Sequence, residues 1–165
     1  MLNLARGVFI WLPSLQIKSQ WPKNLPGNKN VLISGGGLIG VDIATALIPK
    51  NNKVIIVKRT PDFGEDMEII AKTLSLKMMK EKGTIFCDNT HIKKIEGRTV
   101  YAERSGRAIC FDDIDVIVVS TSMTSYNPLE KELAGEMPVY VIGDAKRIGN
   151  AQDAIESGYE TAKAL

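Results

Sequence analysis

The feature that most constrains this chain is the stretch Val31–Gly40, which reads VLISGGGLIG. Its apolar start predicts a short buried strand, and GGGLIG then satisfies the pattern G-x-G-x-x-G. A helical pattern follows at once, because apolar residues recur three or four positions apart up to Ile48. A strand, a glycine turn and a helix in this order are typical of a turn that binds the pyrophosphate of a dinucleotide.

The glycines of this turn have separate expected roles. Gly35 would permit the tight turn, Gly37 would let a pyrophosphate approach the backbone, and Gly40 would let the helix pack on the strand. The first amides of the helix would then donate hydrogen bonds to the phosphates. The alternative is a glycine-rich turn without a ligand. The residues expected at the cofactor are Gly35, Gly36, Gly37, Leu38, Ile39 and Gly40.

The composition is that of an ordinary globular protein. With 165 residues, 44% of them hydrophobic, the chain can bury the core of one domain, or of one domain plus a piece of another. The net charge of +2 is too small to favour nucleic acid or an anionic membrane, and no apolar run reaches the length of a membrane span. The apolar run before Pro13 has no cleavage site, so we expect no signal peptide and a cytoplasmic location.

The two cysteines, Cys87 and Cys110, are far apart and form no C-x-x-C motif. This spacing excludes the usual redox-active pair, and a cysteine-ligated iron–sulfur cluster would need four cysteines. Both lie in apolar, strand-like stretches, so we expect buried and unreactive thiols.

Other titratable residues receive structural interpretations, with one exception. His91, the only histidine, is expected at a turn or sheet edge. Asp112, Asp113 and Asp115 could suggest a cation site, but they precede a buried strand, where solvated and capping carboxylates are common, and we expect no metal. Asp144 follows an expected central strand at the end where open α/β sheets bind ligands, so we expect it to be functional.

The order of elements predicts a Rossmann-like, three-layer α/β domain. Residues 1–30 read as an irregular arm or linker with one short strand at Val8–Trp11, and residues 31–165 read as one NAD(P)-binding domain. The expected parallel strands are Val31–Ile33, Lys53–Val57, Thr84–Cys87, Asp115–Ser120 and Val139–Ile142. Three alternating runs, His91–Ile95, Arg98–Arg104 and Arg107–Phe111, predict an antiparallel meander that crosses to the fourth of these strands.

Two further helices are expected. The first runs from Met67 to Lys82, with Ile70, Leu74 and Met78 on its packed face, and the acidic residues of 62–66 would cap it. The second covers Asn150–Leu165. Its expected packed residues are Ala151, Ala154, Ile155, Tyr159 and Ala162.

From Val31 to Leu165 the sequence resembles the nucleotide-binding part of the FAD/NAD(P)-dependent pyridine nucleotide–disulfide oxidoreductase superfamily. The resemblance is carried by GGGLIG, by the meander before DVIVVS, by VYVIGD and by the helix AIESGYETAKAL. Within the superfamily it is most similar to the C-terminal part of 2,4-dienoyl-CoA reductase and its relatives. These relatives are the old-yellow-enzyme-like enoate reductases, the NADH oxidases and trimethylamine dehydrogenase.

The resemblance implies a domain that binds NAD(P)H and presents the nicotinamide for hydride transfer to a flavin. In the family, a Gly-Asp pair after the last strand approaches the flavin, and here this pair is Gly143 and Asp144. Full-length relatives also carry a separate FAD motif, an FMN-bearing barrel and an iron–sulfur cluster, which this sequence lacks. We therefore expect an incomplete FAD site, with residues 115–165 as a candidate for the returning part of a flavin-binding half.

Two positions depart from the family pattern. The second strand usually ends in a carboxylate, about 20 residues into the motif, that binds the ribose of NAD(H). Lys58 and Arg59 stand there instead, and because cations attract a 2′-phosphate, they favour NADP(H) over NAD(H). The alternative is two solvated loop cations. Beyond DVIVVS, Thr121 and Ser122 replace a glycine-containing end, and the Cβ of Ser122 would narrow the nicotinamide end of the groove.

Two other functions stay open at this point. One is a non-catalytic module that holds ADP or a dinucleotide. The other is a subunit whose site is completed by a flavin-bearing partner domain or chain, which the arm containing Trp11 and Trp21 favours. An oligomer is compatible with either.

Overall fold

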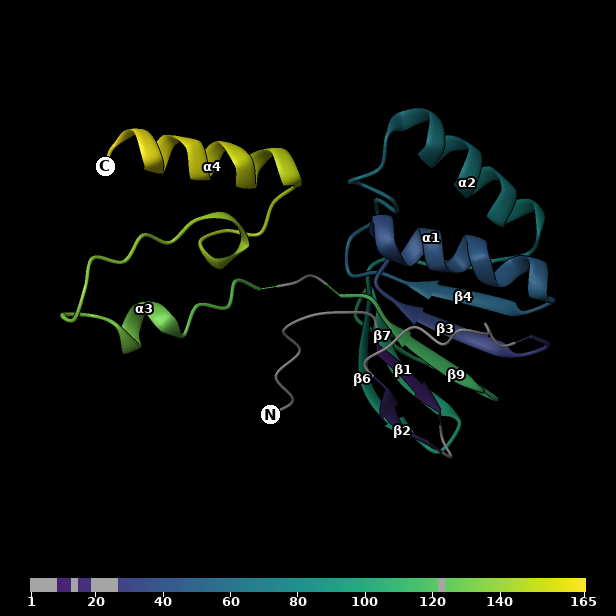
Figure 1. Ribbon diagram of the computed structural model, residues 1–165. Helices are drawn as coiled ribbons and strands as arrows, with labels where there is room; N and C mark the ends of the chain where they lie inside the picture. Colours follow the sequence, from purple (N-terminus) through teal and green to yellow (C-terminus); the bar gives the residue numbers. More distant parts are fainter. Residues whose placement is uncertain (1–8, 13–14, 19–26, 122–123) are drawn as a thin grey trace. The chain divides into compact units, whose positions relative to one another are not determined.

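The computed structural model describes residues 9–12, 15–18, 27–121 and 124–165 (Figure 1). The chain divides into two compact units, one spanning Gly7–Thr121 and one that includes Ser122–Leu165. Within the described ranges, no helix is both long enough and apolar enough to cross a bilayer.

The larger unit is built on a six-stranded sheet with the order β2-β1-β9-β3-β4-β5. Its strands β9, β3, β4 and β5 are parallel to one another. Because β3 lies between β4 and β9, the chain changes winding direction beside β3, which is the switch point of a Rossmann-like sheet. The predicted α/β architecture is confirmed. The parallel strands are β3 (Asn30–Ser34), β4 (Lys53–Val57), β5 (Ile85–Cys87) and β9 (Val116–Val119).

Two strands from the N-terminal arm extend this sheet. β1 (Phe9–Leu12) pairs antiparallel with β9, and β2 (Leu15–Lys18) pairs antiparallel with β1. The sequence predicts only the first of these strands, with bounds that lie one residue too early. It does not predict β2, because β2 forms only by pairing with β1, which β9 in turn holds at the sheet edge. Trp21 lies outside the described residues.

The predicted meander is present as a separate three-stranded antiparallel sheet. It consists of β6 (Thr90–Glu96), β7 (Thr99–Arg104) and β8 (Arg107–Phe111). Ser105 and Gly106 between β7 and β8 both have positive φ, +49° and +80°, as a tight two-residue hairpin turn requires.

The parallel strands are covered on both faces, so three layers form. Along β3, Val31 and Ile33 belong to a core shared with α1 (Leu38–Leu47) and α2 (Ile69–Glu81). Leu32 points the other way, into a second core that includes residues of the meander. Figure 1 shows the same layering, with both helices on one face of the sheet and the meander on the other.

The packed face of α2 differs from the prediction. Met79 is fully buried, whereas Ile70 and Leu74 are 65% and 62% exposed. Met78 is half-buried and packs against the core as expected, together with Leu76. The helix carries two apolar stripes, and its crossing over α1 decides which of them is covered.

The two cysteines lie in different environments. Cys87 is buried as expected, and burial raises the pKa of its thiol. The expectation for Cys110 is wrong, because its side chain is exposed on β8, an edge strand of the meander. His91 is exposed on β6, the other edge strand.

The second unit contains α3 (Leu129–Glu132), the 3₁₀ turn η2 (Gly143–Ala145) and α4 (Ala151–Lys163). The predicted strand Val139–Ile142 is wrong, since these residues form no helix or strand. A strand needs a neighbour to pair its backbone groups, and among residues 124–165 there is none.

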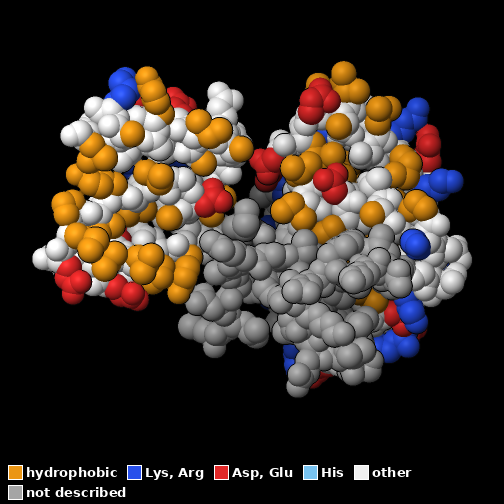
Figure 2. Space-filling model, in the orientation of Figure 1, with side chains coloured by type: hydrophobic (Ala, Val, Ile, Leu, Met, Phe, Trp, Pro, Cys, Tyr) orange, Lys and Arg blue, Asp and Glu red, His pale blue; other side chains and the backbone are white. Residues whose placement is uncertain are grey.

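Apolar side chains of this unit face outward (Figure 2). Ile155 and Tyr159, expected on the packed face of α4, are 73% and 62% exposed. No second layer within the described part of the unit covers them. The helix start is as predicted, because Asn150 and Asp153 form a reciprocal capping box.

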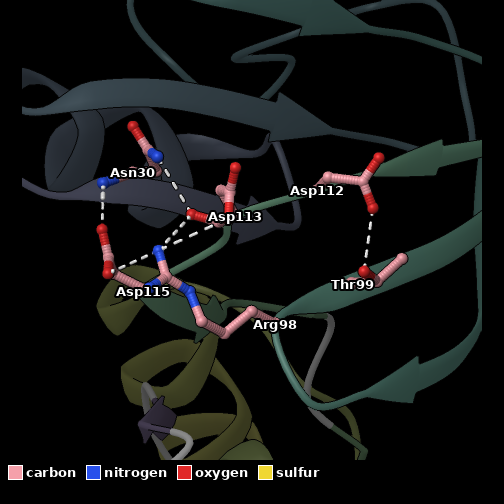
Figure 3. Close-up of polar contacts among 6 residues, drawn as sticks. All are labelled: Asn30, Arg98, Thr99, Asp112, Asp113 and Asp115. Carbon is pink, nitrogen blue, oxygen red and sulfur yellow. Dashed lines mark hydrogen bonds and ion pairs between the residues drawn. The ribbon is translucent and has the colours of Figure 1, made fainter.

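A polar cluster ties the meander to the parallel sheet at the strand ends opposite the glycine turn (Figure 3). We call it the strand-end cluster. The carboxylate of Asp115 accepts a hydrogen bond from the Asn30 backbone N–H at 2.9 Å and forms an ion pair with the Arg98 guanidinium at 3.0 Å. The side chains of Asn30 and Arg98 also donate to the carbonyl of Asp113. Asp112 lies nearby, where it accepts from the Thr99 hydroxyl at 2.8 Å.

The Asp115→Ala substitution should lower the free energy of unfolding by about 1–3 kcal/mol, because it leaves the part-buried Asn30 backbone N–H without its acceptor and removes the ion pair with Arg98. Urea unfolding followed by circular dichroism measures this loss. Asp113→Asn is the matched control, since the backbone carbonyl of Asp113 accepts the hydrogen bonds, while its exposed carboxylate reaches Arg98 only at 4.0 Å. Asn also tolerates the positive φ of +57° at this position. Equal losses in the two variants would contradict the assigned role of the Asp115 carboxylate.

Candidate functional site

The glycine-rich turn lies where the parallel strands β3 and β9 end. The Gly35 N–H donates to the carbonyl of Val57 at 2.9 Å, and the Ser120 N–H donates to the carbonyl of Ser34 at 2.7 Å. These bonds hold the turn between the ends of three strands, at the switch point of the sheet. Open α/β sheets bind ligands at this edge.

At two glycines of the motif, an added side chain would collide with backbone atoms. Gly35 has a φ of +117°, and a Cβ added to it would lie 1.8 Å from the carbonyl oxygen of Ser120. A Cβ on Gly40 would lie 1.9 Å from the carbonyl oxygen of Gly35. Both distances are far inside van der Waals contact, so α1 can approach β3 this closely only with glycine at both positions.

The third glycine of the motif faces open space. Among the described residues, a Cβ on Gly37 would have one neighbour within 4 Å, the Asp66 carboxylate at 3.8 Å. Gly37 is also the N-cap of α1, and no side chain caps the helix. The first amides of α1, at the exposed residues Leu38 and Ile39, are therefore available to an anion. This uncapped end and the open space beside it fit a pyrophosphate.

The end of β9 contributes to the same edge. The Thr121 backbone nitrogen would lie 3.2 Å from a Cβ on Gly35, and Thr121 itself is exposed. Ser122 lies outside the described residues, so its effect on the nicotinamide end stays a prediction.

Lys58 directly follows β4, and both its backbone groups and its side chain are bonded to other parts of the larger unit. Its backbone N–H donates to the Cys87 carbonyl, and its carbonyl accepts from the Thr90 N–H, both at 2.9 Å. Its side chain is only 11% exposed, because its ammonium group pairs with the Glu65 carboxylate at 2.8 Å and donates to the Asp62 carbonyl. Lys58 is thus no solvated loop cation.

Arg59 differs from its neighbour. Its side chain is exposed, and within the described residues it has no hydrogen-bond or ion-pair partner. Of the two cations at the end of β4, Arg59 is therefore the one without a partner in the part of the chain that the structure describes.

An acidic loop, residues Asp62–Asp66, covers part of the glycine turn. The Gly64 N–H donates to the Gly36 carbonyl at 2.7 Å, and the Phe63 ring is buried against Gly36. The sequence places these acids in a loop but gives no sign that the loop returns to the glycines. The folding of this loop onto the glycine turn depends on tertiary contacts, which the spacing of residues along the sequence does not reveal.

The cap of α2 comes from another residue than predicted. The Glu68 carboxylate accepts hydrogen bonds from the backbone N–H groups of Ala71 at 3.0 Å and Ile70 at 2.9 Å. These bonds, first the one from Ala71, hold the pKa of Glu68 below its usual range. The acidic loop ends before the helix and does not cap it.

In the second unit, Gly143 and Asp144 belong to η2 rather than to a strand end. The Gly143 N–H donates to the Ser157 hydroxyl at 3.5 Å, and the Asp144 carboxylate accepts from the Gly149 N–H at 3.3 Å. Lys146 and Arg147 line a shallow hollow beside Gly143.

Fold and turn together define a Rossmann-like domain of the kind that binds dinucleotides. Residues 12–158 match the pyridine nucleotide-disulphide oxidoreductase family, and the chain belongs to it. A curated relative, the NADH oxidase of Thermoanaerobacter brockii, is 30% identical over 137 residues. That match covers 82% of this chain and 21% of the relative, so the chain spans about a fifth of the relative's length.

Solved structures share the fold. Histamine dehydrogenase from Rhizobium sp. 4-9 has a TM-score of 0.69 at 20% identity, over 88% of this chain and 23% of the dehydrogenase chain. A 2-naphthoyl-CoA reductase has a TM-score of 0.68 at 21% identity, over 86% of this chain and 22% of the reductase chain.

Gly40→Ala should destabilise the chain by about 3 kcal/mol or more, although alanine is the better helix former, because its Cβ meets a backbone oxygen. Gly37→Ala, with open space at its Cβ, should change the free energy of unfolding by less than about 1 kcal/mol. Chemical denaturation of both variants tests this contrast. A Gly40→Ala variant as stable as the unmodified chain would refute the close contact.

Glu68→Gln should make stability less dependent on pH. The folded pKa of Glu68 lies below its ordinary value of 4.5, so the stabilisation is complete above that pH and is lost as pH falls through the folded pKa. The stability difference between the unmodified chain and Glu68→Gln should therefore shrink in acid. A stability difference that stays the same down to acid pH would contradict the assigned role of the Glu68 carboxylate.

Proposed function

We propose that the chain is the NAD(P)H-binding domain of a flavin-dependent oxidoreductase. The observation that carries the proposal is the uncapped N-terminus of α1 at the sheet's switch point, with open space at Gly37. The N–H groups of Leu38 and Ile39 donate to the pyrophosphate, and Gly37 admits it to the backbone. The nicotinamide, once bound, supplies a hydride to a flavin held elsewhere.

The proposed dinucleotide is NADP(H) in preference to NAD(H). Arg59, exposed and without a partner among the described residues, is available to a 2′-phosphate. Lys58 is the second cation at this position, although it already holds Glu65. Gly143 and Asp144 would approach the flavin, as the family resemblance suggests.

A second candidate is a binding subunit that a flavin-bearing partner domain or chain completes. The exposed apolar residues of the second unit favour it, because soluble proteins seldom leave such surfaces uncovered. They include Tyr140, which is 56% exposed, and Ile155 on α4. Flavin absorbance that persists through purification of the chain alone would argue against this candidate.

Calorimetric titration with NADPH and NADH tests the main proposal. Arg59→Ala should weaken NADPH about tenfold, which corresponds to about 1.4 kcal/mol, and leave NADH within about twofold. Arg107→Ala, an exposed arginine on β8, is the matched control and should change neither affinity. Absence of binding by either dinucleotide at millimolar concentration would overturn the proposal.

A further inference from the structure

The ammonium group of Lys58 is already neutralised by the acidic loop. Glu65 lies 2.8 Å from it, and the Lys58 side chain is 11% exposed while that of Glu65 is 49% exposed. An ion pair with one end this well covered loses less to solvent than two fully exposed side chains do. An incoming anion therefore has to compete with Glu65 for this lysine.

Glu65 is presented by a loop with fixed anchors. The Gly64 N–H bonds to the Gly36 carbonyl at 2.7 Å, directly beside Glu65. The Phe63 ring is 9% exposed and packs edge-on to Phe86, with 5.0 Å between ring centres. The position of Glu65 is thus set by the core and by the glycine turn, rather than by its pairing with Lys58 alone.

The other charges of this region do not restore a positive field. Lys72 pairs with Asp62 at 2.6 Å, and its hydrogen bond is the main reason that the pKa of Asp62 is lowered. Between residues 58 and 72 there are three cations and four carboxylates. They are Lys58, Arg59 and Lys72 against Asp62, Glu65, Asp66 and Glu68.

From these contacts we infer that Glu65 sets the selectivity between the two dinucleotides, by occupying Lys58 in competition with the 2′-phosphate of NADP(H). The inference rests on the proposed function. A phosphate monoester carries a charge of about −1.5 to −2 at neutral pH, so it must displace the Glu65 carboxylate or bind beside it. NAD(H) has no 2′-phosphate, so its binding does not compete with the Glu65 carboxylate for Lys58. Glu65 therefore weakens NADP(H) binding selectively.

The test is a set of titrations with NADPH and NADH on Glu65→Gln. The affinity for NADPH should rise about tenfold, or about 1.4 kcal/mol, while that for NADH stays within about twofold. Because the effect is electrostatic and partly exposed, the gain should shrink at high salt. Glu65→Ala should reproduce it, and unfolding curves of both variants check that the loop change leaves the fold intact.

Two controls separate this effect from a general change of charge. Glu81→Gln removes the same charge at the far end of α2 and should leave both affinities unchanged. Asp66→Asn removes the carboxylate nearest Gly37, beside the pyrophosphate site common to both ligands, and should strengthen both equally.

The outcomes are distinguishable. If Glu65→Gln strengthens NADPH and NADH to the same extent, or neither of them, the selectivity role is overturned while NADH binding by the unmodified chain still supports the proposed function. If no variant binds either dinucleotide, the proposed function fails, and the role of Glu65 fails with it.

Discussion

The contact between α1 and the end of β3 is the constraint on which the larger unit depends. At Gly40 the helix passes so close to the Gly35 carbonyl that even a methyl group would not fit. This close approach packs α1 directly on the parallel strands. The uncapped N-terminus of α1 then lies at the edge where β3 and β9 end. The same contact that stabilises the layer also places the uncapped start of α1 at the sheet edge, so the stability of the fold and the proposed dinucleotide site depend on the same few glycines.

The fold could be predicted where the signal is local or periodic. The β-branched runs, the glycine turn and the hairpin turns of the meander each specify their own backbone, and their order defines the sheet. The prediction failed where the structure of a segment depends on contacts with another element of the chain. Val139–Ile142 has the composition of a strand but pairs with no strand among the described residues, and Cys110 faces outward on an edge strand. The packed face of α2 depends on its crossing with α1, which no periodicity reveals.

The candidate site was predicted in part for the same reason. The glycine motif predicts the turn, which the structure contains. The end of the second parallel strand predicts Lys58 and Arg59 as neighbours of the adenosine ribose, and this role stays a prediction. What the sequence could not give is the state of Lys58, since its partner Glu65 comes from a loop that folds back through a hydrogen bond to Gly36 and the burial of Phe63. Two adjacent cations of equal formal charge thus differ, one engaged within the protein and the other free among the described residues.

The position of β9 also bears on how the chain folds. β9 pairs with β3 on one side and β1 on the other, yet the whole of β4, β5 and the meander separates it from β3 along the chain. Pairings this distant form slowly, because much chain entropy is lost before they add stability. Until β9 arrives, β3 presents an unpaired apolar edge, which is a template for association with other chains. The strands of the meander pair only with their neighbours in the chain, so the meander can form early. Its formation would bring β9 close to β3 and shorten the time during which the edge of β3 is unpaired.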